Sequence, residues 1–164
     1  MPGWHEDGYL FRRKYRTAAQ RWLAEMDVNF FATLTFRQNV GLLGARKNIE
    51  HWLACLDRHY LGRQWWKRPS AERTIGIGLA ENVESNLHYH WLLRLPESAK
   101  NENAAQRGRT IERFWTQATR GGTCRVVEIR DSGAPRYAAK QLVRPGYADH
   151  FILASEFHVF DKHN

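Results

Sequence analysis

The alternation of apolar and polar residues along the chain predicts short strands separated by helices. β-Branched and aromatic residues at a period of two predict strands at about 28–37, 74–81, 87–95, 124–130 and, in the tail, within 151–160. Apolar residues at helical spacing predict helices at about 8–26, 43–60, 104–119 and 136–143. Because helices connect most strands and one polar turn joins two of them, we expect an α+β fold: a mostly antiparallel sheet of about five strands backed by helices.

The same periodicities predict which side chains are buried. In the first strand, one face carries Phe30, Ala32, Leu34 and Phe36, and the other carries Thr33, Thr35 and Arg37. The apolar candidates of the first helix are Leu10, Tyr15, Trp22, Leu23 and Met26. We therefore expect the first helix to pack through these residues and the first strand to bury only one face.

Length and composition fit one globular domain spanning residues 1–164, with a core at about 28–145 and a basic helix before it. No apolar run approaches the roughly 20 residues of a membrane helix, and no secretory signal is visible. The two cysteines have no close-spaced ligand pattern, and a phosphate-binding G-x-x-x-x-G-K-[ST] loop is absent from the sequence. We expect a cytoplasmic protein, nucleoid-associated when bound to DNA, with no membrane partner and a monomer as the default.

Charge makes nucleic acid a candidate partner. The formal net charge is +8, and basic residues gather with aromatics in residues 12–16 and 63–73. Basic side chains neutralise phosphates, and aromatic faces stack on unpaired bases. A solvated basic surface explains the charge equally well, and Trp65 and Trp66 can equally seal the edge of a core.

Two histidines on one strand are the strongest chemical signal. His88 and His90 are two residues apart in an apolar strand, so their rings point to the same face and can share a divalent metal. Glu81 ends the preceding strand and pairs across the hairpin, which makes it the expected oxygen ligand. Glu84, in the turn, is the alternative ligand. An H-x-H pair also arises by chance, so the apolar strand and the matched acid carry the interpretation.

A tyrosine and a lysine one helical turn apart give the second signal. Tyr137 and Lys140 are neighbours on a predicted helix. A cation or metal beside a tyrosine favours the nucleophilic phenolate, and a lysine can also hold a phosphate. Taken alone, however, this helix is better explained as an amphipathic helix that packs through Tyr137 and Leu142.

Together these motifs resemble those of the HUH endonuclease superfamily, especially the single-tyrosine initiator (Rep) proteins of rolling-circle replication. The resemblance rests on the H-x-H strand, on the later Tyr-x-x-Lys helix, and on residues 31–36, which look like the family's first motif. It covers about residues 28–145. It implies a ferredoxin- or RRM-like sheet fold and a tyrosine that follows the histidines, whereas relaxases have the reverse order.

The resemblance implies an enzyme that nicks and rejoins single-stranded DNA at an origin sequence or hairpin through a 5′-phosphotyrosine intermediate. It assigns Tyr137 as nucleophile, Lys140 as its helper, and Glu81, His88 and His90 as ligands of Mg²⁺ or Mn²⁺. A helicase domain is missing from the sequence, so a host helicase is a further expected partner. The residues expected to contact DNA are Thr33, Thr35, Arg94, Arg130 and Arg136, with Glu128 also expected on or near the histidine face. Glu128 and Arg130 can equally be a solvated pair across strands.

Three other functions stay open at this point. The chain can be a non-catalytic protein that binds single strands or hairpins, which would tolerate phenylalanine at position 137. It can be a nuclease that uses activated water and leaves no covalent adduct. It can also be a Y1-type transposase, which shares the same chemistry.

Overall fold

The computed structural model describes the backbone of residues 4–144 and 150–158 and the side chains of residues 13–144 and 150–158. The helices are α1 (Trp4–Glu25), α2 (Leu42–Leu61), α3 (Ala104–Thr119) and α4 (Gly133–Leu142). The strands are β1 (Phe30–Thr35), β2 (Ile75–Glu81), β3 (His88–Arg94), β4 (Cys124–Glu128) and β5 (Phe151–Leu153). Short 3₁₀ turns follow α2, β3 and β5. The predicted α+β class is confirmed.

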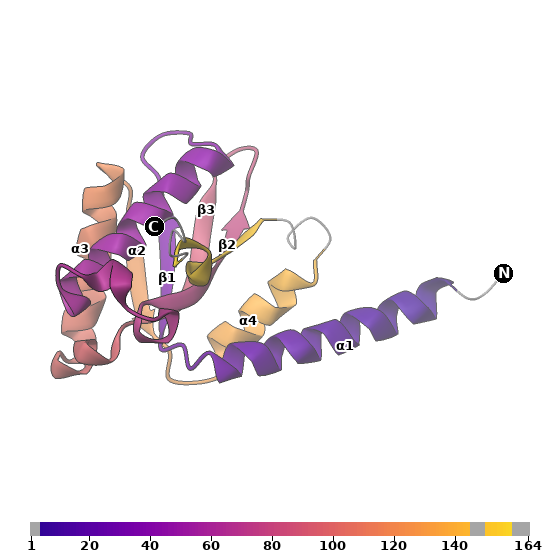
Figure 1. Cartoon of the computed structure of the whole chain (residues 1–164). Coiled ribbons are helices and arrows are strands. Elements are labelled where there is room, and N and C mark those ends of the chain that lie inside the picture. The colour runs from indigo at the N-terminus through magenta and orange to yellow at the C-terminus, as the bar shows by residue number, and fades with distance from the viewer. Residues whose placement is uncertain (1–3, 145–149, 159–164) are drawn as a thin grey trace, which may run out of the picture.

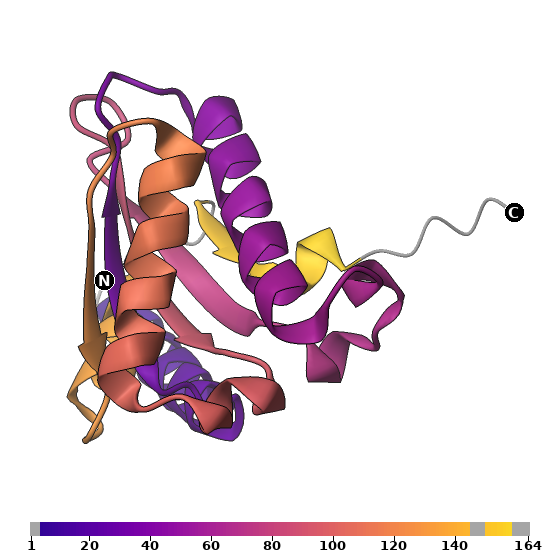
Figure 2. The ribbon, with the colours of Figure 1, turned by 90° about the vertical axis from the view of Figure 1, so that its left-hand side faces the viewer.

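The five strands form one antiparallel sheet in the order β4-β1-β3-β2-β5. β2 and β3 form the predicted hairpin at its centre. Figure 2 shows α2 and α3 side by side along one face of the sheet. Figure 1 shows α4 lying along α1 on the other side, with the N-terminal part of α1 extending beyond the rest of the molecule.

The face of the sheet under α2 and α3 holds an aromatic core. Trp52, Trp91 and Trp115 are fully buried, and the ring of Trp52 meets the other two edge-to-face at 5.8 and 5.6 Å between centroids. Gly78 lies opposite Trp91 in the hairpin, and a Cβ at that position would overlap the tryptophan ring. The glycine therefore provides the space that this large side chain occupies.

The opposite face holds a smaller core under α1 and α4. Leu23 of α1, Ala138 and Ala139 of α4, and Leu79 and Leu92 of the hairpin are buried together. Among the described side chains of α1, those that this cluster buries lie toward its C-terminal end. The predicted burial of Tyr15 and Trp22 is wrong, because both are exposed, whereas the predicted burial of Leu23 is confirmed. The side chain of Leu10 lies outside the described residues.

A buried polar cluster closes the C-terminal end of α2. Asp57, fully buried on α2, accepts hydrogen bonds from Arg73 Nε at 2.8 Å and from the backbone amide of Thr74 at 2.7 Å. The Arg73 guanidinium lies 4.7 Å from the centroid of the Trp65 ring. His158 is buried beside this pair, with its Nδ1 2.6 Å from Ser70 Oγ. Trp65 thus seals a core edge, whereas Trp66 is exposed.

Strand β4 forms one edge of the sheet, and its outward side is partly occupied. The backbone amide of Val126 donates to Glu112 Oε1 of α3 at 3.1 Å. The amides of Thr35 and Ile129, by contrast, are used in bonds between β1 and the β4 segment. An acidic side chain thus satisfies an edge amide that no strand among the described residues pairs.

Element boundaries otherwise follow the predictions closely. Helix α3 begins and ends at the predicted residues, and α4 begins three residues earlier than predicted, at Gly133. The predicted tail strand is confined to β5 and continues as a 3₁₀ turn, and residues 159 and 160 lie outside the described residues. Among the described helices, none is both long and apolar enough to cross a bilayer.

Candidate metal and tyrosine site

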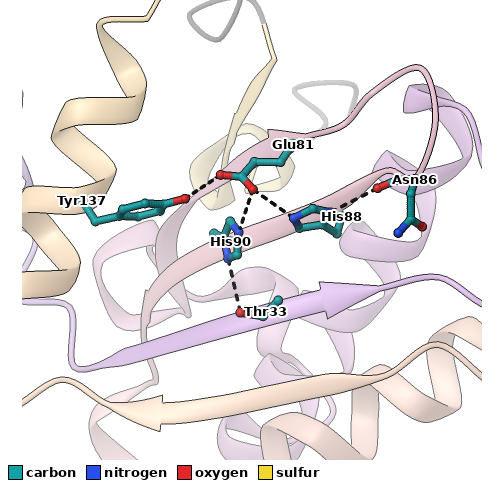
Figure 3. A network of polar contacts seen from close by, with 6 residues as sticks. All are labelled: Thr33, Glu81, Asn86, His88, His90 and Tyr137. Atoms are coloured by element: carbon teal, nitrogen blue, oxygen red, sulfur yellow. Dashed lines mark hydrogen bonds and ion pairs between the residues drawn. The ribbon is translucent and has the colours of Figure 1, made fainter.

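The central hairpin brings one carboxylate and two imidazoles together. Glu81 pairs with His88 across the hairpin, and His90 lies one step further along the same face. Glu81 Oε2 is 3.0 Å from His88 Nε2 and 3.2 Å from His90 Nε2 (Figure 3). One ligand atom from each residue lies within 4.8 Å of the others, so the cluster can hold a metal ion. Glu84 is exposed in the turn, outside this group.

The far nitrogen of each ring is held by an oxygen. His88 Nδ1 lies 3.1 Å from the backbone carbonyl oxygen of Asn86, and His90 Nδ1 lies 3.3 Å from Thr33 Oγ1. A carbonyl oxygen only accepts hydrogen bonds, so this contact requires the His88 proton on Nδ1. The Nε2 lone pair then faces the carboxylate of Glu81, and only a second proton or a cation makes that approach favourable. Such outer contacts typically orient histidines that bind metals.

The charge state of Glu81 suits a ligand. Partial burial raises the pKa of its carboxyl group, but hydrogen bonds from Tyr137, His90 and His88 and the charge of His90 lower it. The net pKa lies below the ordinary value. Glu81 is therefore an anion at neutral pH, as a ligand for a divalent cation must be.

Helix α4 brings Tyr137 to the same carboxylate. The Tyr137 hydroxyl donates to Glu81 Oε1 at 2.6 Å, while Oε2 faces the two histidines (Figure 3). Ala138 and Ala139, the next two residues, are buried, which anchors the helix beneath the tyrosine. Tyr137 itself is 37% exposed, so its side chain is accessible from solvent. One carboxylate thus connects the two motifs identified in the sequence.

The remaining α4 candidates lie at the surface beside the tyrosine. Lys140 is exposed and three residues after Tyr137, so both project from the same side of the helix. Arg136 lies at the preceding position. Their predicted roles toward DNA stay predictions.

Phe31 is a site residue that sequence reasoning missed. Its ring stacks on His90 at 5.4 Å between centroids and 15° between planes, and it meets Tyr137 edge-on at 6.4 Å. Phe31 thus packs against both rings, which also meet each other edge-on at 5.8 Å between centroids. The available signal was its position two residues before Thr33, which places both on the same face of β1.

The histidine face of the sheet continues onto β1 and β4. Thr33 pairs with His90, and Thr35 pairs with His88. The Thr35 hydroxyl lies 2.6 Å from Thr123 Oγ1 and accepts from the Thr123 amide, so it joins β1 to the start of β4. Arg125 pairs with Thr33 and is exposed, and it extends this row of residues. Arg125 was also missed.

The predicted placement of Glu128 and Arg130 near the histidines is wrong. Glu128 pairs with Phe30, whose side chain is buried on the opposite face, toward α3. Arg130 lies with Glu128, at 3.2 Å from its Oε2, and both line a hollow beside α3. The error is one of register, since alternation gives the residues that share a face but not the face itself.

Arg94 shares the histidine face of β3 but lies at its far end. It pairs with Ile75, at the opposite end of the hairpin from Glu81. Its guanidinium donates to the backbone carbonyl of Ala71 at 3.2 Å. The structure therefore does not bring Arg94 to the tyrosine, and its contact with DNA stays a prediction.

In comparisons with protein-family models, curated proteins and solved structures, the chain matches none of them. The case for a function therefore rests on the chemistry of this site.

Proposed function

We propose that this chain is a metal-dependent endonuclease and strand transferase of the HUH type, which nicks single-stranded DNA through Tyr137. One observation carries the proposal: Glu81 accepts the Tyr137 hydroxyl on Oε1 while its Oε2 faces His88 and His90. A tyrosine hydroxyl at a two-histidine, one-carboxylate cluster is the arrangement that this chemistry needs, because nucleophile and metal must act on one phosphate.

The donor set fits the divalent ions expected for this chemistry. A carboxylate suits Mg²⁺ and Mn²⁺, and two imidazoles favour Mn²⁺ of the two because it is the softer ion. Held by Glu81, His88 and His90, the ion would act as a Lewis acid on the scissile phosphate. The Nδ1 atom of each histidine lies within hydrogen-bonding distance of an oxygen atom, as is usual for histidines that bind a metal through Nε2, and this supports the assignment.

The chain's own residues supply the nucleophile and its surroundings. Tyr137 Oη would attack phosphorus, forming an O–P bond and breaking the bond from phosphorus to the 3′ oxygen. The phenolic proton passes to solvent, the departing 3′ oxygen takes a proton, and the 5′ phosphate stays on the tyrosine. Attack of a 3′-OH on the phosphotyrosine reverses these steps and rejoins the strand. Lys140, on the same side of α4, would hold the phosphate.

In a biological setting, this reaction would start rolling-circle replication of a plasmid or virus, with a host helicase opening the duplex. A Y1-type transposase would use the same steps. Thr33 and Arg125, which pair across the histidine face, and Arg136, which precedes the tyrosine, would contact the substrate strand.

The test is a nicking assay with end-labelled single-stranded oligonucleotides and Mn²⁺, including known rolling-circle origin sequences and random ones. Wild type should give a protein-linked band on a denaturing gel that requires metal and is absent for Tyr137→Phe. Tyr60→Phe is the matched control, because it removes a hydroxyl that binds Glu102, a residue outside the metal and tyrosine site. Cleavage without an adduct, unchanged in Tyr137→Phe, would instead indicate a water-using nuclease. Binding without cleavage would indicate a non-catalytic binder.

A further inference from the structure

Helix α1 has a stretch that no other described element covers. Every residue from 13 to 18 is exposed, so the helix is open on all sides over more than one turn. Figure 1 shows this helix passing α4 and extending away from the sheet. Packing against the core does not stabilise a stretch of helix that is exposed on all sides, which leaves it available to contact a binding partner.

The charge of this stretch has one sign. Arg13, Lys14 and Arg21 surround the small side chains of Thr17 and Ala18, and these five residues line a shallow hollow on one face of the helix. The sequence contains no acidic residue between positions 13 and 24. The hydroxyl of Thr17 donates to the Arg13 carbonyl within the helix, so the cations alone define the chemistry of this face.

The basic stretch is joined firmly to the nucleophile's helix. Ala19 and Leu23 of α1 are buried against Ala138, Ala139 and Leu142 of α4. Ala138 directly follows Tyr137. A polyanion bound along α1 would therefore lie in a fixed relation to the tyrosine.

We propose that the Arg13, Lys14 and Arg21 face of α1 binds the phosphate backbone of duplex DNA, such as the stem beside the nicking site. This inference rests on the proposed function for its biological setting, but not for its binding test. Arg13 and Arg21 are eight residues apart, which is about 12 Å along a helix. That span matches the roughly 12 Å width of the major groove, so the two arginines reach phosphates on both sides of it.

Two other binding partners would fit the basic face of α1 less well. A membrane-surface helix needs a broad apolar face. The basic face itself is lined by Arg13, Lys14, Thr17, Ala18 and Arg21, and the large exposed side chains of the described part of α1 are Tyr15 and Trp22. A second copy of this chain would bring like charges together. Duplex DNA supplies the opposite charge along the whole length of the face.

The experiment measures binding of a fluorescein-labelled hairpin with a stem of about 12 base pairs, just over one helical turn, and a single-stranded arm. The arm alone is the second probe, and both are titrated without metal at several salt concentrations. The variant is Arg13→Ala/Lys14→Ala/Arg21→Ala, which keeps good helix formers at exposed positions. The matched control, Arg63→Ala/Lys67→Ala/Arg68→Ala, removes the same charge from the connection after α2.

We expect the α1 variant to bind the hairpin about 10-fold or more weakly. The slope of log K against log salt should fall by about 2.7, because each of the three cations that neutralises a phosphate contributes about 0.9. Binding of the arm and the behaviour of the control should change little. An unchanged hairpin affinity and slope, an equal loss on the arm, or an equal loss in the control would overturn the proposal. So would charge-dependent binding of anionic vesicles in place of the hairpin. A wild type that binds the hairpin through α1 but forms no tyrosine adduct would refute only the nicking function.

Discussion

His158 makes stability depend on pH in a way that the structure lets us predict. The ring is 6% exposed and sits beside the Asp57 and Arg73 pair, with Nδ1 at Ser70 Oγ. Burial lowers its pKa, the charge of Arg73 lowers it further, and Asp57 and the Thr74 backbone oppose this, with a result of about 4. The folded protein therefore holds this histidine neutral.

The direction in which stability changes with pH follows from proton linkage. Between the ordinary pKa of 6.5 and the folded value of about 4, the unfolded chain binds more protons than the folded one. The free energy of unfolding therefore falls as the pH drops through this window. Each unit of pH lowers the free energy of unfolding by at most about 1.4 kcal/mol, and the whole window lowers it by about 3 kcal/mol. Glu81, whose pKa is lowered from 4.5, contributes mainly below this range.

The assay is urea denaturation of wild type and His158→Asn at about pH 7, pH 6 and pH 5. Asparagine keeps an acceptor for the Ser70 hydroxyl but does not titrate. From the highest to the lowest of these pH values, we expect the free energy of unfolding of wild type to fall by about 1–2 kcal/mol more than that of the variant. Equal losses in the two proteins would show that His158 is free to take up a proton in the folded state, which would refute the reasoning.

Two further predictions concern the hairpin and the metal cluster. Gly78→Ala should destabilise the fold by about 1–3 kcal/mol, because the new Cβ overlaps Trp91, whereas Gly44→Ala, whose Cβ meets only Val40 at 3.9 Å, should stabilise it slightly. Equal effects in thermal denaturation would contradict that packing. Mn²⁺ at about a hundred times its dissociation constant should raise the free energy of unfolding by about 2.7 kcal/mol in wild type and in His51→Ala, but not in His90→Ala. Stabilisation that survives in His90→Ala would place the ion elsewhere.

Much of the site was predictable because it is local in sequence. The hairpin turn limits which residues oppose one another, so the sequence placed Glu81 opposite His88 or His90, and the structure pairs it with His88. The alternation of β3 likewise predicted that both histidines share a face. The contact of Tyr137 with Glu81, by contrast, required long-range information, because it depends on how α4 packs across the sheet.

The wrong predictions share one physical origin, which is the lack of pairing information between distant segments. Glu128 was placed on the histidine face because nothing in β4 itself reveals that it pairs with Phe30. Trp22 was placed in a core because helical spacing does not show which side of a helix its neighbour covers, and here Ala19 and Leu23 are buried while Trp22 is exposed. Phe31 went unnoticed as a site residue because its role depends on two rings from other elements.

The bond from the Val126 amide to Glu112 bears on how this protein avoids aggregation. An edge strand with unused amides is a template on which another chain can add a strand. Here the incoming strand would have to displace a carboxylate that is itself held on α3, and would leave that anion beside its own backbone carbonyls. Replacing Glu112 with glutamine would remove the negative charge from this contact while keeping the shape of the side chain. Such a variant should reveal how far one side chain keeps the sheet from growing between molecules.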